Sequence, residues 1–338
     1  MADHLTDVAM AARFAARVAM SRQTEVDDDL ESHFVELSAE AEPLITEETG
    51  FAVPSSAIAR VLTRAEWASA NVDSMLTMIG PMIRKLDKRI VRTPVSGLVR
   101  LAYRPALGAQ LGMVLGFLSQ RVLGQYDTLV EHGDQVWFVG SNIVNMERKL
   151  RFVPRDFRLW IVLHELTHRA QFTGNPWLRD HFRTGVNELL DSMDLDARGL
   201  TARLRAVFTD RGAPFGVRLL TPAQREAFDR MQAFMSVIEG HGNFVMDRIA
   251  ERIIPTQPQM RRVLRGQGGA GGPISKLIGK LLGLEMKRAQ YEQGQAFFDR
   301  IFEVGGQAKV RYCFTGPDAL PSLQEIRNPD LWIARTPA

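Results

Sequence analysis

Residues 159–168 read Leu-Trp-Ile-Val-Leu-His-Glu-Leu-Thr-His and contain two histidines four positions apart. None of these residues breaks a helix, and Pro154 and Asp156 stand where a helix start is expected. Side chains four apart on a helix are offset by only about 40° around its axis, so His164 and His168 share one face. Two imidazoles placed in this way can bind one zinc ion at about 2.0–2.1 Å. The stretch predicts a buried helix that carries two zinc ligands.

Glu165 follows the first histidine, and its side chain is rotated by about 100° from that of His164. The carboxylate is thereby expected beside the metal without binding it. Zinc lowers the pKa of a bound water toward about 7, and a carboxylate at this place can accept the proton and later return it to a leaving group. A chance arrangement is less favoured, because only 7 of the 338 residues are histidine. Arg169 is unusual, since zinc protease helices usually carry an uncharged residue there.

A third ligand is needed, because a catalytic zinc takes three protein ligands and keeps one position open. A third histidine six residues after the second is excluded, since that position is Gly174. Glu188 has a plausible spacing but belongs to an ordinary amphipathic helix pattern, and His181 follows Pro176 in a stretch that resembles a surface loop. Together with two residues of a later helix, they make up the four candidates for the third ligand: His181, Glu188, Glu239 and His241.

Residues 222–253 predict a long helix, with Thr221 as N-cap and Pro222 in the first turn. Gly240 and Gly242 stand in the middle of this helix. Each glycine costs about 1 kcal/mol relative to alanine, which indicates a packing or functional reason. Close approach of another helix near the metal would supply that reason.

Glu239 is the favoured third ligand. It shares a helix face with Asn243, whereas His241 is rotated by about 200° from it. Glu239 and His241 therefore cannot bind the same ion unless the helix distorts. We expect Asn243 or His241 to support the ligands or to contact the substrate.

The rest of the chain predicts a mainly α, multi-helix fold with a minor element of two or three β-strands. Apolar spacing favours helices over residues 5–20, 57–70, 74–90 and 105–124. Residues 134–140 and Lys309–Phe314 predict short strands. The first of these strands is either an edge that pairs with an extended peptide or part of a buried hairpin. Residues 265–273 predict a loop and 274–288 a helix.

No linker divides the chain, so we expect one metallohydrolase domain over residues 1–338, with residues 1–50 as an N-terminal helical extension. Basic residues are interleaved with acidic ones despite a pI near 9.2, which argues against a nucleic-acid partner. The longest uncharged stretch, residues 105–120, is too short for a bilayer span of about 20 residues. Cys313 is the only cysteine, which excludes an intramolecular disulfide and favours the cytoplasm.

The two predicted metal motifs are His164-Glu-Leu-Thr-His168 and Glu239-Gly-His-Gly-Asn243-Phe-Val-Met-Asp247. Together they resemble the zincin-like type 2 metallopeptidases, actinobacterial proteins associated with the biosynthesis of a deazaflavin coenzyme. Further matches lie in residues 116–127, 176–178 and 289–298, so the resemblance spans roughly residues 55–335.

This resemblance implies a zincin-like fold with zinc on His164, His168 and Glu239, and with Glu165 as general base. Zincins with a glutamate ligand often place an aspartate four residues after it, which orients a histidine ligand. Asn243 stands at that position here, so the orienting role is weaker or passes to Asp247.

The predicted function is zinc-dependent hydrolysis of a peptide or of a small-molecule amide, as in a metallopeptidase. One alternative is a helical-bundle, metal-dependent transferase acting on thiols, which needs no base at Glu165 and would favour His241 as third ligand. Another is a non-catalytic zinc protein, although closed structural sites usually contain cysteine. The sequence does not identify the natural substrate or the oligomeric state.

Overall fold

The computed structural model describes residues 6–18, 26–91, 96–126, 134–192, 221–266 and 284–337. Within these ranges the chain forms twelve α-helices and one three-stranded sheet. The prediction of a mainly α fold with a minor β element is confirmed. No helix of the described residues combines the length and the apolar character needed to cross a bilayer. The predicted cytoplasmic location stays a prediction.

The described chain divides into two compact units, Met1–Gly174 with Met246–Leu264, and Asn175–Val245 with Arg265–Ala338. Helix α10 (Pro222–Ile253) is continuous and contributes residues to both units. The prediction of a single domain over 1–338 stays a prediction. Both helices of the first 50 residues, α1 (Thr6–Val18) and α2 (Leu30–Thr49), pack within the first unit.

Three strands of the first unit form a mixed sheet in the order β1-β3-β2. Strand β1 (Ile58–Leu62) is parallel to β3 (Gln135–Val139), and β2 (Gly124–Tyr126) is antiparallel to β3. The strand predicted at residues 134–140 is confirmed. It is the middle strand, because β1 and β2 pair with its two sides. Of the two alternatives for this strand, the peptide-binding edge is therefore wrong, and its antiparallel pairing with the preceding strand β2 agrees with the buried hairpin.

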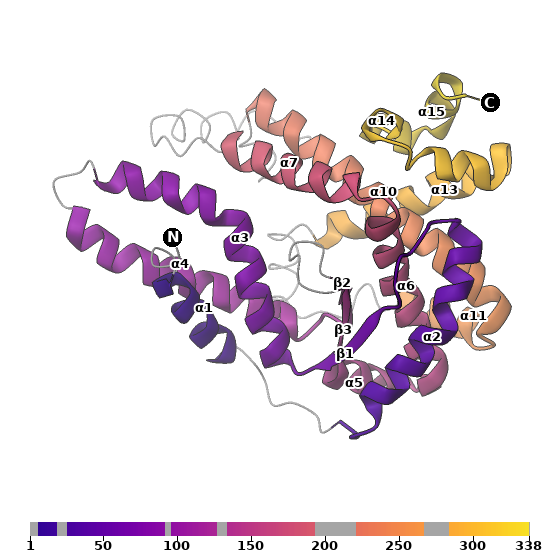
Figure 1. Ribbon diagram of the computed structural model, residues 1–338, viewed down its shortest axis with the longest axis horizontal. Coiled ribbons are helices and arrows are strands. Elements are labelled where there is room, and N and C mark those ends of the chain that lie inside the picture. The colour runs from indigo at the N-terminus through magenta and orange to yellow at the C-terminus, as the bar shows by residue number, and fades with distance from the viewer. Residues whose placement is uncertain are drawn as a thin grey trace. The chain divides into compact units, whose positions relative to one another are not determined.

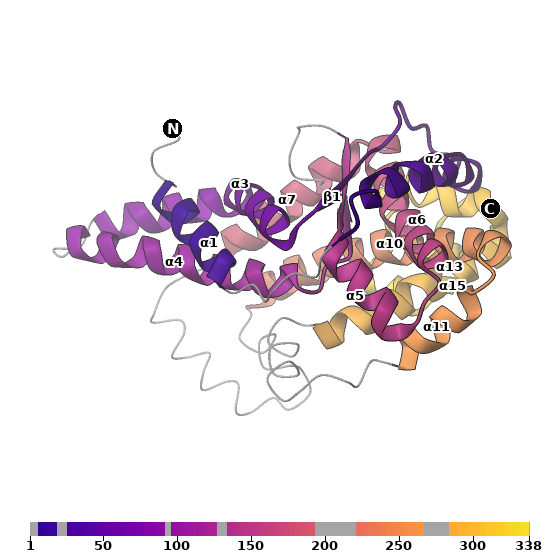
Figure 2. The ribbon, with the colours of Figure 1, turned by 90° about the horizontal axis from the view of Figure 1, so that it is seen from below.

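Helices α1, α3 (Arg64–Val91) and α4 (Ser96–Ser119) lie together and enclose an apolar core that includes Val72 and Leu115 (Figures 1 and 2). The helix predicted over residues 74–90 is part of α3. The helix predicted over 57–70 is wrong for residues 58–62, which form β1. The helix predicted over 105–124 ends earlier than expected, at Ser119.

The metal-motif helix is α6 (Pro154–Gly174), as the sequence predicts. In the first unit α6 packs against α2, α5 (Gly140–Leu150) and the strands β2 and β3. Figure 2 shows α2 and α6 side by side. Most residues around the two histidines are buried, namely those from Ile161 to Leu163 and from Glu165 to Thr167. The helix α11 (Gln257–Gly266) completes this unit.

The second unit contains α7 (Trp177–Ser192), α13 (Leu284–Tyr312), the short 3-10 helix Pro317–Ala319, α14 (Leu323–Arg327) and α15 (Pro329–Arg335). Helix α13 is kinked at Gly306, whose φ of 60° and ψ of −156° are accessible almost only to glycine. The strand predicted at Lys309–Phe314 is wrong, because α13 continues to Tyr312 and Cys313 and Phe314 form a turn. Residues 267–283 lie outside the described residues, and with them most of the predicted loop at 265–273 and of the helix at 274–288.

Candidate metal centre

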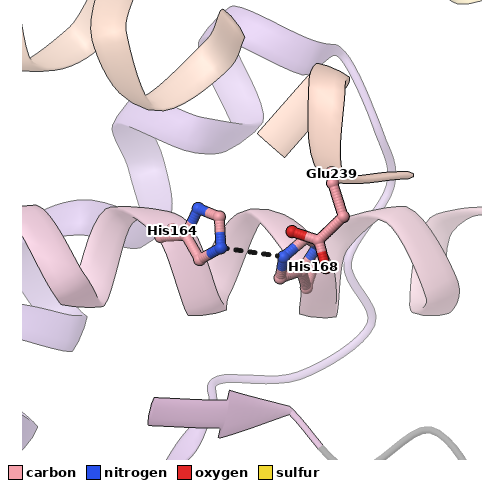
Figure 3. Close-up of side chains that lie close together, drawn as sticks. All are labelled: His164, His168 and Glu239. Atoms are coloured by element: carbon pink, nitrogen blue, oxygen red, sulfur yellow. Dashed lines mark hydrogen bonds between the residues drawn. The ribbon is translucent and has the colours of Figure 1, made fainter. Parts of the chain in front are cut away.

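The two histidines of α6 lie on one face of the helix, one turn apart, with their Nε2 atoms 3.1 Å apart (Figure 3). Their rings are nearly perpendicular, with an interplanar angle of 81°. Two ligands of a tetrahedral ion at about 2.0–2.1 Å lie about 3.3–3.4 Å from each other. The separation of the two nitrogens therefore fits a shared zinc ion with only a small adjustment of the side chains.

Glu239 of α10 completes the group. One ligand atom from each of His164, His168 and Glu239 lies within 4.8 Å of the other two, and all three residues are half-buried (Figure 3). Two imidazoles and one carboxylate are a donor set that catalytic zinc sites use with one position left open. The three residues therefore fit the metal in both their chemistry and their spacing.

Gln171 orients one of the histidines, which the sequence analysis did not anticipate. Its side-chain oxygen Oε1 lies 2.9 Å from Nδ1 of His168, and Gln171 is fully buried. Because an amide oxygen only accepts hydrogen bonds, Nδ1 carries the hydrogen and Nε2 keeps its lone pair for a metal. Such outer contacts hold the ring and the tautomer of a ligand histidine. The three-residue spacing on α6 was a usable signal.

Glu165 is 8% exposed, and its side chain lies against the first residue of strand β2. A Cβ atom placed on Gly124, the first residue of β2, would lie 2.6 Å from Cγ of Glu165. The side chain of this acid, which follows His164 in the sequence, is therefore enclosed in a region from which water is largely excluded, and its electrostatic effect there is strengthened.

Arg169 follows the second histidine, yet it serves another part of the structure. Its guanidinium is buried; Nε donates a hydrogen bond of 2.8 Å to Asp134, and Nη1 donates one of 3.1 Å to Glu42. Nη2 donates to the backbone oxygen of Ser55 at 2.5 Å. Arg169 thus ties α6 to α2, to the segment before β1 and to the residue before β3, which explains a charged residue at this position.

The other candidate ligands lie elsewhere. Glu188 pairs with Arg230 at 3.0 Å. His181 lies within α7 between the rings of Trp177 and Phe234, so the loop expected there is wrong. Burial lowers the pKa of His181, and Glu188 partly opposes this shift.

The His241 ring is fully buried among three aromatic rings. Ring centroids of Phe314, Phe298 and Phe244 lie 4.6, 5.2 and 6.4 Å from that of His241. This position on α10 is consistent with the predicted rotation away from Glu239.

Asp247 and Asn243 follow Glu239 on α10. Asp247 forms an ion pair of 2.9 Å with Arg261, and Asn243 is half-buried. Their predicted supporting roles stay predictions.

The glycine prediction for α10 is explained within the second unit. A Cβ atom on Gly240 would lie 2.4 Å from the carbonyl carbon of Gly294 in α13. The two helix backbones are thus in direct contact, one residue after Glu239. The absence of side chains at Gly240 and Gly294 allows the helices to cross at this distance, which holds α10 in place beside the residue that completes the metal-ligand group.

Comparison with known proteins agrees with this arrangement. A family model described as zincin-like metallopeptidase matches residues 6–333. A crystal structure of a candidate hydrolase with a novel fold from Chloroflexus aurantiacus is 33% identical, with a TM-score of 0.73, and the match covers 96% of this chain and 97% of that one. No curated protein matches. The chain belongs to the zincin-like metallopeptidase family.

Proposed function

We propose that this protein is a zinc-dependent hydrolase that cleaves a peptide or a small-molecule amide. In this proposal His164, His168 and Glu239 bind the zinc ion, and Glu165 is the general base. The observation that carries it is the convergence of one ligand atom from each of these three residues within 4.8 Å, next to a buried carboxylate. Family membership supports zinc and hydrolysis in general.

The metal ligands and Gln171 prepare the site for a zinc ion. When bound, zinc supplies a Lewis acid that acidifies water and polarises a carbonyl group. His168 keeps its Nε2 lone pair available because Gln171 accepts the hydrogen of Nδ1. Glu239 adds one negative charge to two neutral imidazoles, which favours a divalent cation.

Glu165 moves the proton. Its carboxylate accepts a proton from the attacking water as the oxygen forms a bond to the carbonyl carbon. The C–N bond then breaks, and Glu165 returns the same proton to the departing nitrogen, so that the products are a carboxylic acid and an amine. The enclosure of Glu165 by α6 and β2 keeps its carboxylate close to the reacting atoms.

The position of His241 favours this function over a thiol transferase. The transferase alternative expects His241 as the third ligand, whereas its ring packs against Phe244, Phe298 and Phe314. A non-catalytic zinc protein is less favoured as well, because a closed structural site normally has four protein ligands and the group formed by the described residues has three.

The decisive experiment compares Glu165→Gln with the native protein. The variant should bind one zinc ion per chain and lose hydrolysis of a quenched fluorescent peptide library and of a panel of small amides by at least a factor of about 10². Undiminished hydrolysis by the variant would refute the role of Glu165.

Metal content tests the ligand set separately. Glu239→Ala should lose zinc, while His241→Ala should retain it. Zinc retained by Glu239→Ala would contradict the proposed third ligand.

The cytoplasmic location and the association with deazaflavin-coenzyme biosynthesis stay predictions.

A further inference from the structure

Strand β2 begins directly against the carboxyl group of Glu165. A Cβ atom on Gly124 would lie 2.6 Å from Cγ, 2.9 Å from Cδ and 2.8 Å from Oε1 of Glu165. Ordinary van der Waals contact between such atoms begins at about 3.4 Å. Any side chain at position 124 would therefore enter the space that the Glu165 carboxyl group occupies.

The backbone of Gly124 does not itself require glycine. Among the glycines of the described ranges, positive φ values occur at Gly50 and Gly306. Gly124 has the conformation of a strand residue and pairs with Phe138 of β3. Alanine can adopt that conformation without strain, so the requirement for a bare Cα at this position comes from Glu165.

The chain that leads into β2 is held in place by buried hydrogen bonds. The side-chain nitrogen of Asn142 donates to the backbone oxygens of Ser119 and Val122, at 2.7 and 2.6 Å. Arg64 in turn donates to Asn142 Oδ1 at 2.7 Å. Both Asn142 and Arg64 are more than 90% buried, so moving this segment would disrupt hydrogen bonds that water cannot easily replace.

Backbone hydrogen bonds to β3 hold strand β2 itself in place. The backbone nitrogen of Val139 donates to the oxygen of Leu123 at 2.8 Å, and the β2–β3 ladder continues through Gly124. Strand β2 is fixed by these hydrogen bonds, whereas the Glu165 side chain can rotate about its single bonds. The Glu165 side chain is therefore the part that moves. A methyl group on residue 124 would thus displace the Glu165 carboxylate.

We propose that Gly124 is a positioning residue for Glu165, and that the bare backbone of β2 forms the wall that fixes the carboxylate beside His164 and His168. The catalytic consequence rests on the proposed function, whereas the contact itself does not. Since the contact is steric, replacing Gly124 should affect the protein only as long as the Glu165 side chain is present.

A double-mutant cycle tests this dependence. Glu165→Ala removes all three atoms that a Cβ on residue 124 would meet. In the native background, Gly124→Ala should raise the unfolding equilibrium constant in urea by about tenfold, whereas in the Glu165→Ala background it should change it by less than about twofold. If Gly124→Ala alone does not fold, the double variant should restore folding.

Gly140→Ala is the matched control. A Cβ atom there would lie 2.8 Å from Cγ1 of Val61 and 3.0 Å from Cδ2 of Leu30, so it is similarly crowded, in the same unit, but by apolar side chains. Its effect on unfolding should be the same with and without Glu165→Ala. Equal costs of Gly124→Ala in both backgrounds, or failure of the double variant to fold, would overturn the proposal.

The catalytic consequence has its own readout. Gly124→Ala should bind zinc with native affinity and lower kcat by at least tenfold with KM nearly unchanged, while the folded Gly140→Ala protein keeps the native kcat. Zinc affinity lowered by more than tenfold, or an unchanged kcat, would overturn the positioning role. A native protein without hydrolase activity would refute the proposed function, and the coupling in the unfolding cycle would still be measured.

Discussion

Gly240→Ala is the sharpest test of how the crossing of α10 and α13 supports the metal ligands. A Cβ atom there would lie 2.4, 2.6 and 2.7 Å from the backbone C, Cα and O atoms of Gly294. Ordinary contact begins at about 3.4 Å, so the two backbones must separate by about 1 Å. Neither backbone can rotate away as a side chain would.

The energetic cost follows from this geometry. Overpacking in a core costs about 1–3 kcal/mol, and contact with a helix backbone places this variant at the upper end. Alanine recovers about 1 kcal/mol relative to glycine within a helix. The free energy of unfolding should therefore fall by about 2 kcal/mol, measured by urea denaturation of the zinc-free protein.

Zinc affinity is the second readout. Glu239 precedes Gly240, and a displacement of about 1 Å is about half of a zinc–oxygen distance of about 2.0–2.2 Å. Affinity measured by competition with a chromophoric chelator should fall by at least tenfold. Gly185→Ala is the control, because its Cβ would meet the flexible end of Met231; its stability should change by less than about 1 kcal/mol. Equal stability and zinc affinity of the two variants would refute the reasoning.

Three further predictions concern single side chains. Gln171→Leu removes the acceptor for Nδ1 of His168 and should lower zinc affinity about 10–100-fold in the same chelator assay; unchanged affinity would contradict the orienting role. Arg169→Met leaves two carboxylates without their buried partner and should lower the free energy of unfolding in urea by about 3–5 kcal/mol. Arg169→Lys should lower it less. A decrease below about 1 kcal/mol for Arg169→Met would contradict the role of Arg169 in tying α6 to its neighbours. Burial raises the pKa of Glu325, but the hydrogen bond from Arg335 and those from the N-cap serine outweigh it and hold the pKa below the usual 4.5. The ionised form therefore stabilises the fold above pH 4.5, and this contribution is lost as the pH falls below that value. Glu325→Gln should flatten the decline in Tm between pH 5 and about pH 3, and an unaltered decline would exclude this carboxyl as its source.

The metal helix was predictable because its information is local. Two histidines at a four-residue spacing, an apolar run before them and a proline at the start specify α6 without reference to the rest of the chain. The same holds for α10, where Thr221 accepts a hydrogen bond from the backbone of Gln224 and begins the helix as expected.

The segment Lys309–Phe314 was wrongly predicted as a strand because its apolar residues fit both the two-residue period of a strand and the spacing of a helix. Val310, Tyr312 and Phe314 alternate as in a strand, yet Val310, Cys313 and Phe314 also fall at helical spacing, and these three are buried in the structure. A short apolar run cannot distinguish the two by itself. Strand β1 was missed for a related reason, since its partner β3 lies more than 70 residues later in the chain.

The enclosure of Glu165 by Gly124 had no local signal. Nothing in residues 124–126 indicates which helix this strand contacts, because that depends on the pairing of β2 with β3 and on the packing of both against α6. Glu239 could be favoured from its position beside Gly240, but the partner glycine at position 294 becomes recognisable only once α13 is placed.

The hydrogen bonds of Arg169 also have an electrostatic consequence. A buried guanidinium without a partner, one residue after a zinc ligand, would repel a divalent cation. Asp134 and Glu42 both bind this guanidinium and leave the trio with one net negative charge. The positive charge that follows His168 along α6 is therefore compensated within the fold, and Arg169 does not oppose the binding of a divalent cation by the histidines.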